Sequence, residues 1–216
     1  MAGHARLGPS NHRWPHCPGS VREEAAYHDV AGAAAIDGTG SHLLLEMCLE
    51  NSVPAIAYDQ QIIGANHHDN PNGWLVDVDR IDRVQLCLDY VHRRVTFLKE
   101  TYPDVEVIAE RKVDIGGAFG RDDWWGTCDI TIIAKDEGGA VRFVEACDYK
   151  DGRMWVGETD NSQLMAYNFG AMRPYIASGP DLVRPFRSDT IPQVRMSIVQ
   201  PKTSKPIRYQ DVSASY

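Results

Sequence analysis

Apolar residues recur at helical spacing in the first half of the chain, most clearly over residues 79–101. Apolar positions three and four apart in this segment share one face of a helix. They are Ile81, Val84, Leu88, Val91, Val95 and Leu98. Pro103 cannot continue a helix, so the pattern predicts an amphipathic helix that ends just before it.

A shorter apolar pattern predicts an earlier helix, which follows a stretch rich in glycine. Thr39 or Ser41 can cap its N-terminus with a side-chain oxygen, and Pro54 ends it. Residues 10–29 predict a short helical region that proline and glycine interrupt. Residues 59–78 are rich in Asn, His, Asp and Gly, which predicts a loop.

The spacing of apolar residues becomes alternating in the second half of the chain. Residues 105–110 alternate as a strand does, and residues 125–134 and 141–150 predict two further strands. The segment between these two strands, residues 135–140, contains two glycines and predicts a turn. Strands joined by so short a turn pair antiparallel, so we expect a β-hairpin.

A helix over residues 159–178 and a closing strand over residues 192–200 complete the predicted elements. The order is helices, three strands, a helix and a strand, which predicts an α/β fold, specifically an α+β sandwich. The length fits a single domain over residues 1–216. Within it, residues 1–104 are mainly helical and residues 105–200 carry the sheet.

Charge is unevenly distributed along the chain, whose formal net charge is −8. Residues 182–209 carry six basic side chains and one acid, and residues 1–22 carry three arginines and no acid, whereas the middle is acidic. The total is unfavourable for a DNA-binding protein, because affinity comes largely from neutralising phosphates. An acidic centre between basic ends fits a metal site with phosphate contacts around it, and it also fits ordinary surface charge.

The sequence contains no segment typical of membrane insertion or of export. No apolar run approaches the roughly 20 residues that span a bilayer, and the N-terminus lacks the apolar stretch of a secretory signal. The five cysteines are scattered and form no CxxC pair, which favours free thiols over disulfides or a zinc ribbon. We therefore expect a cytoplasmic protein.

The predicted hairpin carries the candidate chemistry. Asp129 lies in its first strand, and Asp148 and Lys150 lie two residues apart in its second, so their side chains share a face. Carboxylates from neighbouring strands can hold a hard divalent cation such as Mg²⁺. A metal ion with a nearby lysine is suited to phosphodiester hydrolysis. Glu145 is three residues from Asp148 and points to the other face, so we leave it out.

Two flanking helices add polar residues to this set. Gln163 and Tyr167 are four apart, hence on one face of the predicted helix, and His42 lies in the first turn of an earlier one. A D-x-K tripeptide by itself is more often a salt-bridged strand end. A lone histidine on a helix is more often a surface or core residue.

Together these motifs resemble those of the RecB-like branch of the PD-(D/E)XK nuclease superfamily. That branch has a helix histidine, then G-x-x-D, then D-x-K on a hairpin, then Q-x-x-x-Y. The corresponding residues here are His42, Gly126-Thr127-Cys128-Asp129, Asp148-Tyr149-Lys150 and Gln163-Leu164-Met165-Ala166-Tyr167. The stretch from Leu7 to Ser20 also resembles phage and prophage proteins of this type. The resemblance covers roughly residues 7–200 and implies a restriction-endonuclease-like mixed central sheet flanked by helices.

The resemblance assigns a role to each motif residue. It implies metal ligands at His42, Asp129 and Asp148, together with the backbone carbonyl of Cys147. It implies a catalytic lysine at Lys150, and DNA-orienting roles for Gln163 and Tyr167. Glu110, on the preceding strand, is a further candidate for the carboxylate cluster.

The resulting expectation is a DNA nuclease that depends on Mg²⁺ or Mn²⁺, acting as an exonuclease in phage replication or recombination in the bacterial host cytoplasm. A phage single-strand-binding or recombination protein is an expected partner beside DNA. No iron–sulfur cluster is expected, because no cysteine follows Cys147. Two alternatives stay open: a structure-specific or restriction-type endonuclease, and a non-catalytic DNA-binding protein on a nuclease-like fold.

Overall fold

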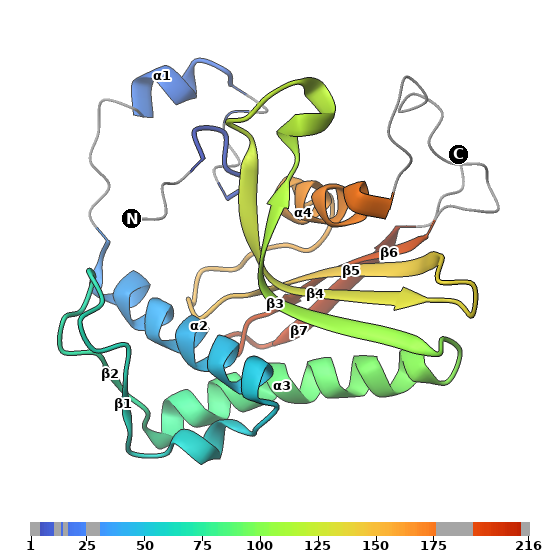
Figure 1. Cartoon of the computed structure of the whole chain (residues 1–216). Helices are drawn as coiled ribbons and strands as arrows, with labels where there is room; N and C mark the ends of the chain where they lie inside the picture. The colour runs from blue at the N-terminus through green and yellow to red at the C-terminus, as the bar shows by residue number, and fades with distance from the viewer. Residues whose placement is uncertain (1–4, 11–13, 15–16, 25–30, 176–191, 213–216) are drawn as a thin grey trace.

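A five-stranded mixed sheet with helices on both faces forms the body of the protein (Figure 1). This architecture confirms the predicted α/β class and the α+β sandwich. The computed structural model describes residues 5–10, 14, 17–24, 31–175 and 192–212. Among these residues, no helix is both long enough and apolar enough to cross a membrane.

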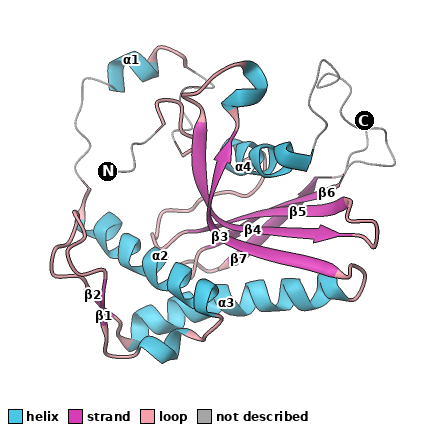
Figure 2. Cartoon of the chain, viewed as in Figure 1, coloured by secondary structure: helices cyan, strands magenta, loops and turns pink. Residues whose placement is uncertain are grey.

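Two long helices cover one face of the sheet: α2 (Ala33–Asn51) and α3 (Val78–Lys99) (Figure 2). Helix α3 confirms the amphipathic segment, and the Asp77 side chain caps it by accepting the backbone N–H of Arg80 at 2.9 Å. Apolar residues of both helices and of the sheet form the larger core. The interrupted helical region near the N-terminus contains the short helix α1 (Ser20–Glu24).

Helix α2 begins at Ala33, so the expected caps Thr39 and Ser41 lie inside the helix, and His42 is not in its first turn. The sequence interpretation was wrong here because it gave too much weight to Gly38 and Gly40. Three alanines, the strongest helix formers, start the helix earlier. A helical glycine is tolerated when a neighbour needs the space.

That neighbour is Trp74, in a segment that was expected to be a loop. Residues 59–78 contain a two-stranded hairpin of β1 (Ile62–Ile63) and β2 (Trp74–Leu75). The Trp74 indole lies so close to α2 that a Cβ at Gly40 would be 2.4 Å from Cγ of the ring. The hairpin is thus anchored to α2 by one buried aromatic side chain.

The main sheet has the order β3-β4-β5-β6-β7. Its strands are β3 (Asp104–Asp114), β4 (Trp125–Lys135), β5 (Val141–Tyr149), β6 (Gln193–Val199) and β7 (Ile207–Val212). The predicted β4–β5 hairpin is confirmed as an antiparallel pair. β6 pairs parallel to β5, and all other neighbours are antiparallel.

Strand β6 does not close the sheet as predicted, because β7 pairs with its outer edge. In β7 the buried position is Arg208, whereas Tyr209 is 53% exposed. The alternation that reveals a strand is therefore missing. Arg208 donates to the carbonyl of Val156 at 2.8 Å and stacks on the Trp155 ring at 3.8 Å.

The opposite face of the sheet is covered by α4 (Ser162–Met172) (Figure 1). This helix is shorter than the predicted 159–178. The Asn161 side chain caps it by accepting the backbone N–H of Leu164 at 3.0 Å, and the 3₁₀ turn η3 (Arg173–Tyr175) follows it. Residues 176–178 lie outside the described residues, as do Arg184 and Arg187, two of the six basic residues in the segment 182–209. A second apolar core fills the space between α4 and the sheet.

Strand β4 changes direction at Asp129. It pairs with β5 only from Ile130 onward, while its first half stays paired with β3 and reaches beyond the sheet (Figure 1). Cys128 is buried in the core beneath α4, and Ile130 in the core beneath α2 and α3. Asp129 therefore lies where the extended β3–β4 hairpin separates from β5.

Candidate metal centre

The Asp129 carboxylate binds a backbone group at the point where β4 separates from β5. Its Oδ2 accepts the backbone N–H of Tyr149 at 2.8 Å, a donor beside the point where β4 leaves β5. A buried backbone N–H requires such a partner. The same oxygen lies 3.6 Å from Nδ1 of His42, which α2 presents to the sheet. The His42 ring packs edge-on against Tyr149, with a centroid distance of 5.3 Å, and this contact fixes its orientation.

Glu110 joins these two residues. The pairs Ala109–Ile130 and Arg111–Cys128 flank it, so it lies opposite Asp129. Its backbone is in the left-handed region at φ 44°, which is uncommon for a residue other than glycine and marks a local irregularity in β3. Ligand atoms of His42, Glu110 and Asp129 all lie within 4.8 Å of one another. The residue added as a further candidate is thus inside the cluster.

Asp148 lies beside this cluster and contacts the remaining motif residues. Its carboxylate accepts hydrogen bonds from Nζ of Lys150 at 3.0 Å and from Nε2 of Gln163 at 3.1 Å. Gln163 also contacts the hydroxyl of Tyr167 at 3.2 Å, one turn further along α4. The predicted residues from β5 and α4 therefore form one connected chain of hydrogen bonds.

Lys150 comes directly after β5 and not within it as predicted, but its backbone still donates to the carbonyl of Val199 at 2.9 Å. That bond extends the pairing with β6 by one residue and orients the side chain toward Asp148. Burial disfavours the charge on Lys150, yet Asp148 and Asp129 outweigh it and raise the lysine pKa above its ordinary value. The Lys150 side chain is therefore protonated and positioned by Asp148.

The carboxylates repel one another. Burial, followed by the charges of Asp129, Glu46 and Asp148, raises the pKa of Glu110 from 4.5 to about 8. Burial also raises the pKa of Asp148 to about 6, with Asp129 adding to the rise and Lys150 opposing it. Such shifts accompany carboxylates that share a site with too little positive charge.

Glu46 was missed in the sequence. It is four residues after His42 on α2, hence on the same helix face, and its charge contributes to the raised pKa of Glu110. Burial and the nearby Glu50 raise the pKa of Glu46 itself. The His42-x-x-x-Glu46 spacing on a helix facing the sheet was the available indication.

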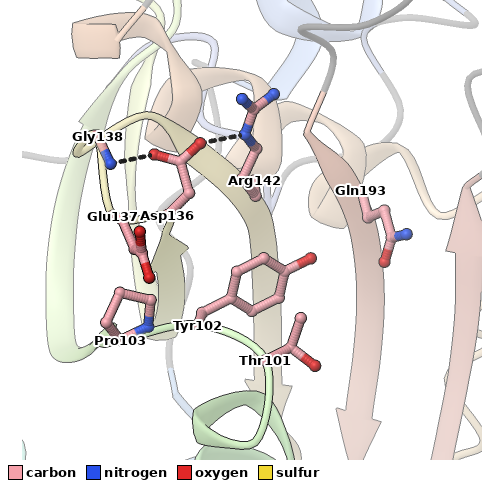
Figure 3. A pocket seen from close by; sticks show the side chains of 8 residues that line it. All are labelled: Thr101, Tyr102, Pro103, Asp136, Glu137, Gly138, Arg142 and Gln193. Carbon is pink, nitrogen blue, oxygen red and sulfur yellow. Dashed lines mark hydrogen bonds and ion pairs between the residues drawn. The ribbon is translucent and has the colours of Figure 1, made fainter.

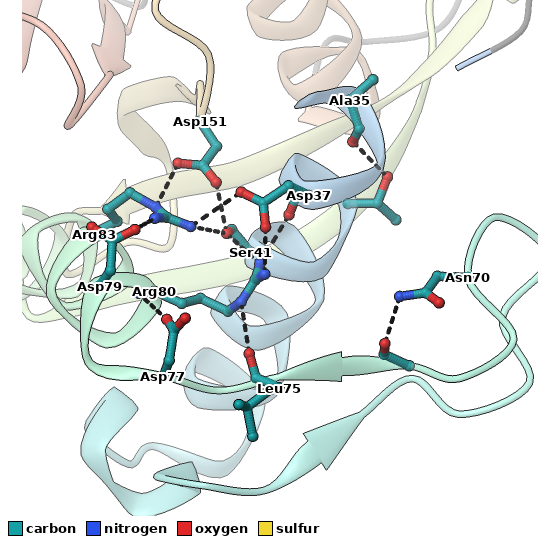
Figure 4. A network of polar contacts seen from close by, with 12 residues as sticks. Ala35, Asp37, Ser41, Asn70, Leu75, Asp77, Asp79, Arg80, Arg83 and Asp151 are labelled. Carbon is teal, nitrogen blue, oxygen red and sulfur yellow. Dashed lines mark hydrogen bonds and ion pairs between the residues drawn. The ribbon is translucent and has the colours of Figure 1, made fainter. Parts of the chain in front are cut away.

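A buried ionic network connects helix α2, which carries His42, to the segment after β5, which carries Lys150 (Figure 4). The Ser41 hydroxyl donates to Oδ2 of Asp151 at 2.8 Å, so the chain neighbour of His42 is bonded to the chain neighbour of Lys150. Arg83 of α3 lies 2.8 Å from the other oxygen of Asp151. Arg80 also donates to Ser41, at 2.8 Å. The network fixes α2 relative to the end of β5.

Cys147 and Glu145 point away from the cluster. The Cys147 thiol is buried against Cys87 in the core beneath α2 and α3, so only its backbone carbonyl is left as a ligand, and that role stays a prediction. Glu145 is fully buried and bonds to Tyr90 at 2.5 Å and to Ser197 at 2.6 Å. Its exclusion from the site agrees with these contacts.

The donor set fits a hard divalent cation. Carboxylate oxygens are the ligands that Mg²⁺ and Mn²⁺ prefer, and an imidazole is acceptable to Mn²⁺. His42, Glu110 and Asp129 present one ligand atom each within coordinating reach of a common point. Positive charge at that point would offset the repulsion that raises the pKa of Glu110.

A cavity lies at the other end of the strands (Figure 3). It measures about 650 Å³ and lies where the β4–β5 turn meets the end of α3. Two of its charged groups, Asp136 and Arg142, are paired with each other at 2.7 Å. About six strand residues, roughly 20 Å, separate it from Asp148. It is therefore separate from the candidate metal centre.

A comparison with known protein families assigns the chain to one of them. The model of the family described as "Protein of unknown function (DUF2800)" matches residues 4–215. The match covers nearly the whole chain, so this protein belongs to that family.

Proposed function

We propose that this DUF2800 family member is a metal-dependent nuclease that hydrolyses phosphodiester bonds of DNA with Mg²⁺ or Mn²⁺, and that it acts as an exonuclease. The proposal extends to DNA as the partner and to a role in phage DNA replication or recombination, which rests on the sequence resemblance alone.

One observation supports the catalytic part of the proposal. Residues from five separate elements, namely α2, β3, β4, the end of β5 and α4, meet at the point where β4 leaves β5. They are His42, Glu110, Asp129, Asp148, Lys150, Gln163 and Tyr167. An apolar core would be more stable than this group of buried and half-buried polar side chains, so their convergence favours a functional reason.

Each side chain has a distinct task in such a reaction. A divalent cation held by the carboxylates and His42 would supply Lewis-acid stabilisation of the phosphoryl charge. Lys150 keeps its proton and adds positive charge beside the scissile phosphate, where negative charge develops. Gln163 holds Asp148 in place through the 3.1 Å hydrogen bond, and Tyr167 holds Gln163. This connected chain keeps the acceptor oxygens aimed at one point.

The test is a DNA cleavage assay with Mg²⁺ or Mn²⁺, comparing the wild type with Lys150→Ala. We expect a rate loss of roughly 100- to 1,000-fold, the usual effect of removing a group that stabilises transition-state charge. Lys135→Ala is the matched control, because Lys135 is a lysine of β4 that pairs with Asp104 at 3.1 Å, away from the cluster. If the wild type cuts no DNA with either metal, or if Lys150→Ala cuts equally well, the proposal is wrong.

The same assay separates exonuclease from endonuclease. An exonuclease degrades linear DNA from its ends and leaves covalently closed circles intact. Cleavage of closed circles at a comparable rate would instead identify a structure-specific or restriction-type endonuclease.

A further inference from the structure

A basic groove runs between the end of β3 and the C-terminal end of α4. Its volume is about 410 Å³. The residues that line it are Arg111, Lys112, Val113, Asp114, Gly170, Arg173 and Pro174. Gly170 allows the close approach of the helix, because a Cβ there would lie 2.8 Å from Cβ of Val113. Among the described residues, three cations and one acid therefore line this groove in a chain whose net charge is −8.

Arg111 is the unusual member of this group. Its side chain is half-buried, and its Nη1 is covered without any hydrogen-bond partner in the part of the chain that the structure describes. Other half-buried cations have a carboxylate: Arg94 lies 3.1 Å from Glu145, and Lys202 lies 3.4 Å from Asp151. A covered guanidinium group without an acceptor is costly, and an anionic ligand would supply the missing acceptor.

The neighbouring cations leave room for such an anion. Nζ of Lys112 lies 4.0 Å above the Trp125 ring, a contact that orients the ammonium group without neutralising it. Arg173 is the only cation of the groove that pairs with its single acid, Asp114. Arg111 and Lys112 thus form no salt bridge with any carboxylate among the described residues.

The groove begins next to the candidate metal centre. Arg111 follows Glu110 directly and pairs with Cys128, the residue before Asp129. Two residues of a strand span roughly 7 Å, so Arg111 and Lys112 lie within about one nucleotide of the carboxylates. A strand cut at the metal centre would therefore continue along this edge of the sheet.

We infer that the groove formed by Arg111, Lys112 and Arg173 binds a phosphate group of the DNA strand, adjacent to the phosphate that is cleaved. This inference rests on the proposed nuclease function. The bound group is either a terminal phosphate or an internal phosphodiester, since both offer the same acceptor oxygens. Guanidinium groups match these oxygens with paired N–H donors.

The test measures DNA affinity for Arg111→Gln in a Lys150→Ala background, which is designed to leave the DNA uncut. The probes are a labelled short duplex with a 5′-phosphate and the same duplex with a 5′-hydroxyl, each titrated over a series of salt concentrations. We expect affinity to fall roughly 10- to 100-fold, as loss of a charge-assisted hydrogen bond does. The slope of log K against log salt should shrink by about 0.9 for the lost phosphate contact.

Two further variants guard against misfolding and non-specific charge effects. Lys112→Gln changes an exposed side chain, so it tests the groove without disturbing the core, and it should also reduce the slope. Arg93→Gln removes an exposed cation from α3, on the other face of the sheet, and should leave affinity nearly unchanged.

The outcomes separate this inference from the proposed function. A loss confined to the 5′-phosphorylated duplex identifies a terminal phosphate, and an equal loss for both duplexes identifies an internal one. If neither groove variant changes affinity or slope, the inference is overturned, even when wild-type protein cuts DNA and Lys150→Ala does not. Wild-type protein that neither binds nor cuts DNA overturns both.

Discussion

Replacing Glu110 with glutamine tests the electrostatics of the candidate metal centre directly. In the metal-free fold the pKa of this carboxyl is about 8 rather than 4.5. The folded state therefore binds more protons than the unfolded chain between these values, and stability falls as pH rises from about 4.5 to about 8. Above about pH 8 the loss of stability is complete, because the carboxyl is ionised in both the folded and the unfolded state.

The magnitude follows from the shift in pKa. A change of one in pKa corresponds to about 1.4 kcal/mol of stability. Screening by solvent at this half-buried position reduces the total destabilisation by the ionised carboxylate to about 2 kcal/mol. Glutamine has nearly the same shape and no charge. At pH 9 and in the presence of a chelator, Glu110→Gln should therefore be about 2 kcal/mol more stable than wild type. For a chain of this size that is roughly 4–8 °C in Tm.

Thermal and urea denaturation at pH 5 and pH 9 measure this difference. Near pH 5 the two proteins should have similar stability, because most Glu110 is protonated in the folded wild type. Adding Mn²⁺ at pH 9 should stabilise wild type more than the variant, since a ligand that binds only the folded state raises stability by mass action. Glu106→Gln is the control, because Glu106 is exposed on the same strand and lies 3.6 Å from Lys135.

Two results would refute this reasoning. One is a stability difference between wild type and Glu110→Gln that is the same at both pH values. The other is equal stabilisation of both proteins by Mn²⁺, which would mean that Glu110 is not a ligand.

Two further substitutions test the scaffold around the site by urea denaturation. Asp151→Ala leaves Arg83 buried without this partner and should lower the free energy of unfolding by about 3 kcal/mol. Its control is Asp79→Ala, at a side chain 79% exposed, which should cost less than about 1 kcal/mol; similar losses would contradict the importance of the buried pair. Gly40→Ala pushes a methyl group into Trp74 and should cost about 1–3 kcal/mol. Its control is Gly38→Ala, whose Cβ would lie 3.8 Å from Cβ of Asp151 and which should be neutral or slightly stabilising; a harmless Gly40→Ala would show that Trp74 is free to move.

The linear sequence was sufficient for the elements whose burial is periodic. The helix at 79–101 and the hairpin of 125–134 and 141–150 could be predicted because their apolar spacing reflects directly which side chains face the core. It was misleading where burial is not periodic. The glycines inside α2 are tolerated because Trp74 packs against Gly40, and in strand β7 the buried position is Arg208.

The same division holds for the candidate site. The sequence by itself identified Asp129, Asp148 and Lys150 as neighbours, because two strands joined by a short turn must lie side by side. Only the tertiary structure decided that Glu110 shares a cluster with His42 and Asp129 while Asp148 bonds to Lys150 and Gln163. That arrangement depends on the point where β4 leaves β5, which no local pattern determines.

Contacts between distant segments were also decided by the tertiary structure alone. Ser41 and Asp151 are 110 residues apart, and each is an ordinary polar residue in its own segment. The same holds for Arg111: its Nη1 is covered without a hydrogen-bond partner among the described residues, and only the fold, which brings β3 and the end of α4 to one groove, shows this. Local spacing determines which face a side chain occupies, whereas closure of the fold determines which charges meet there and which are left without a partner.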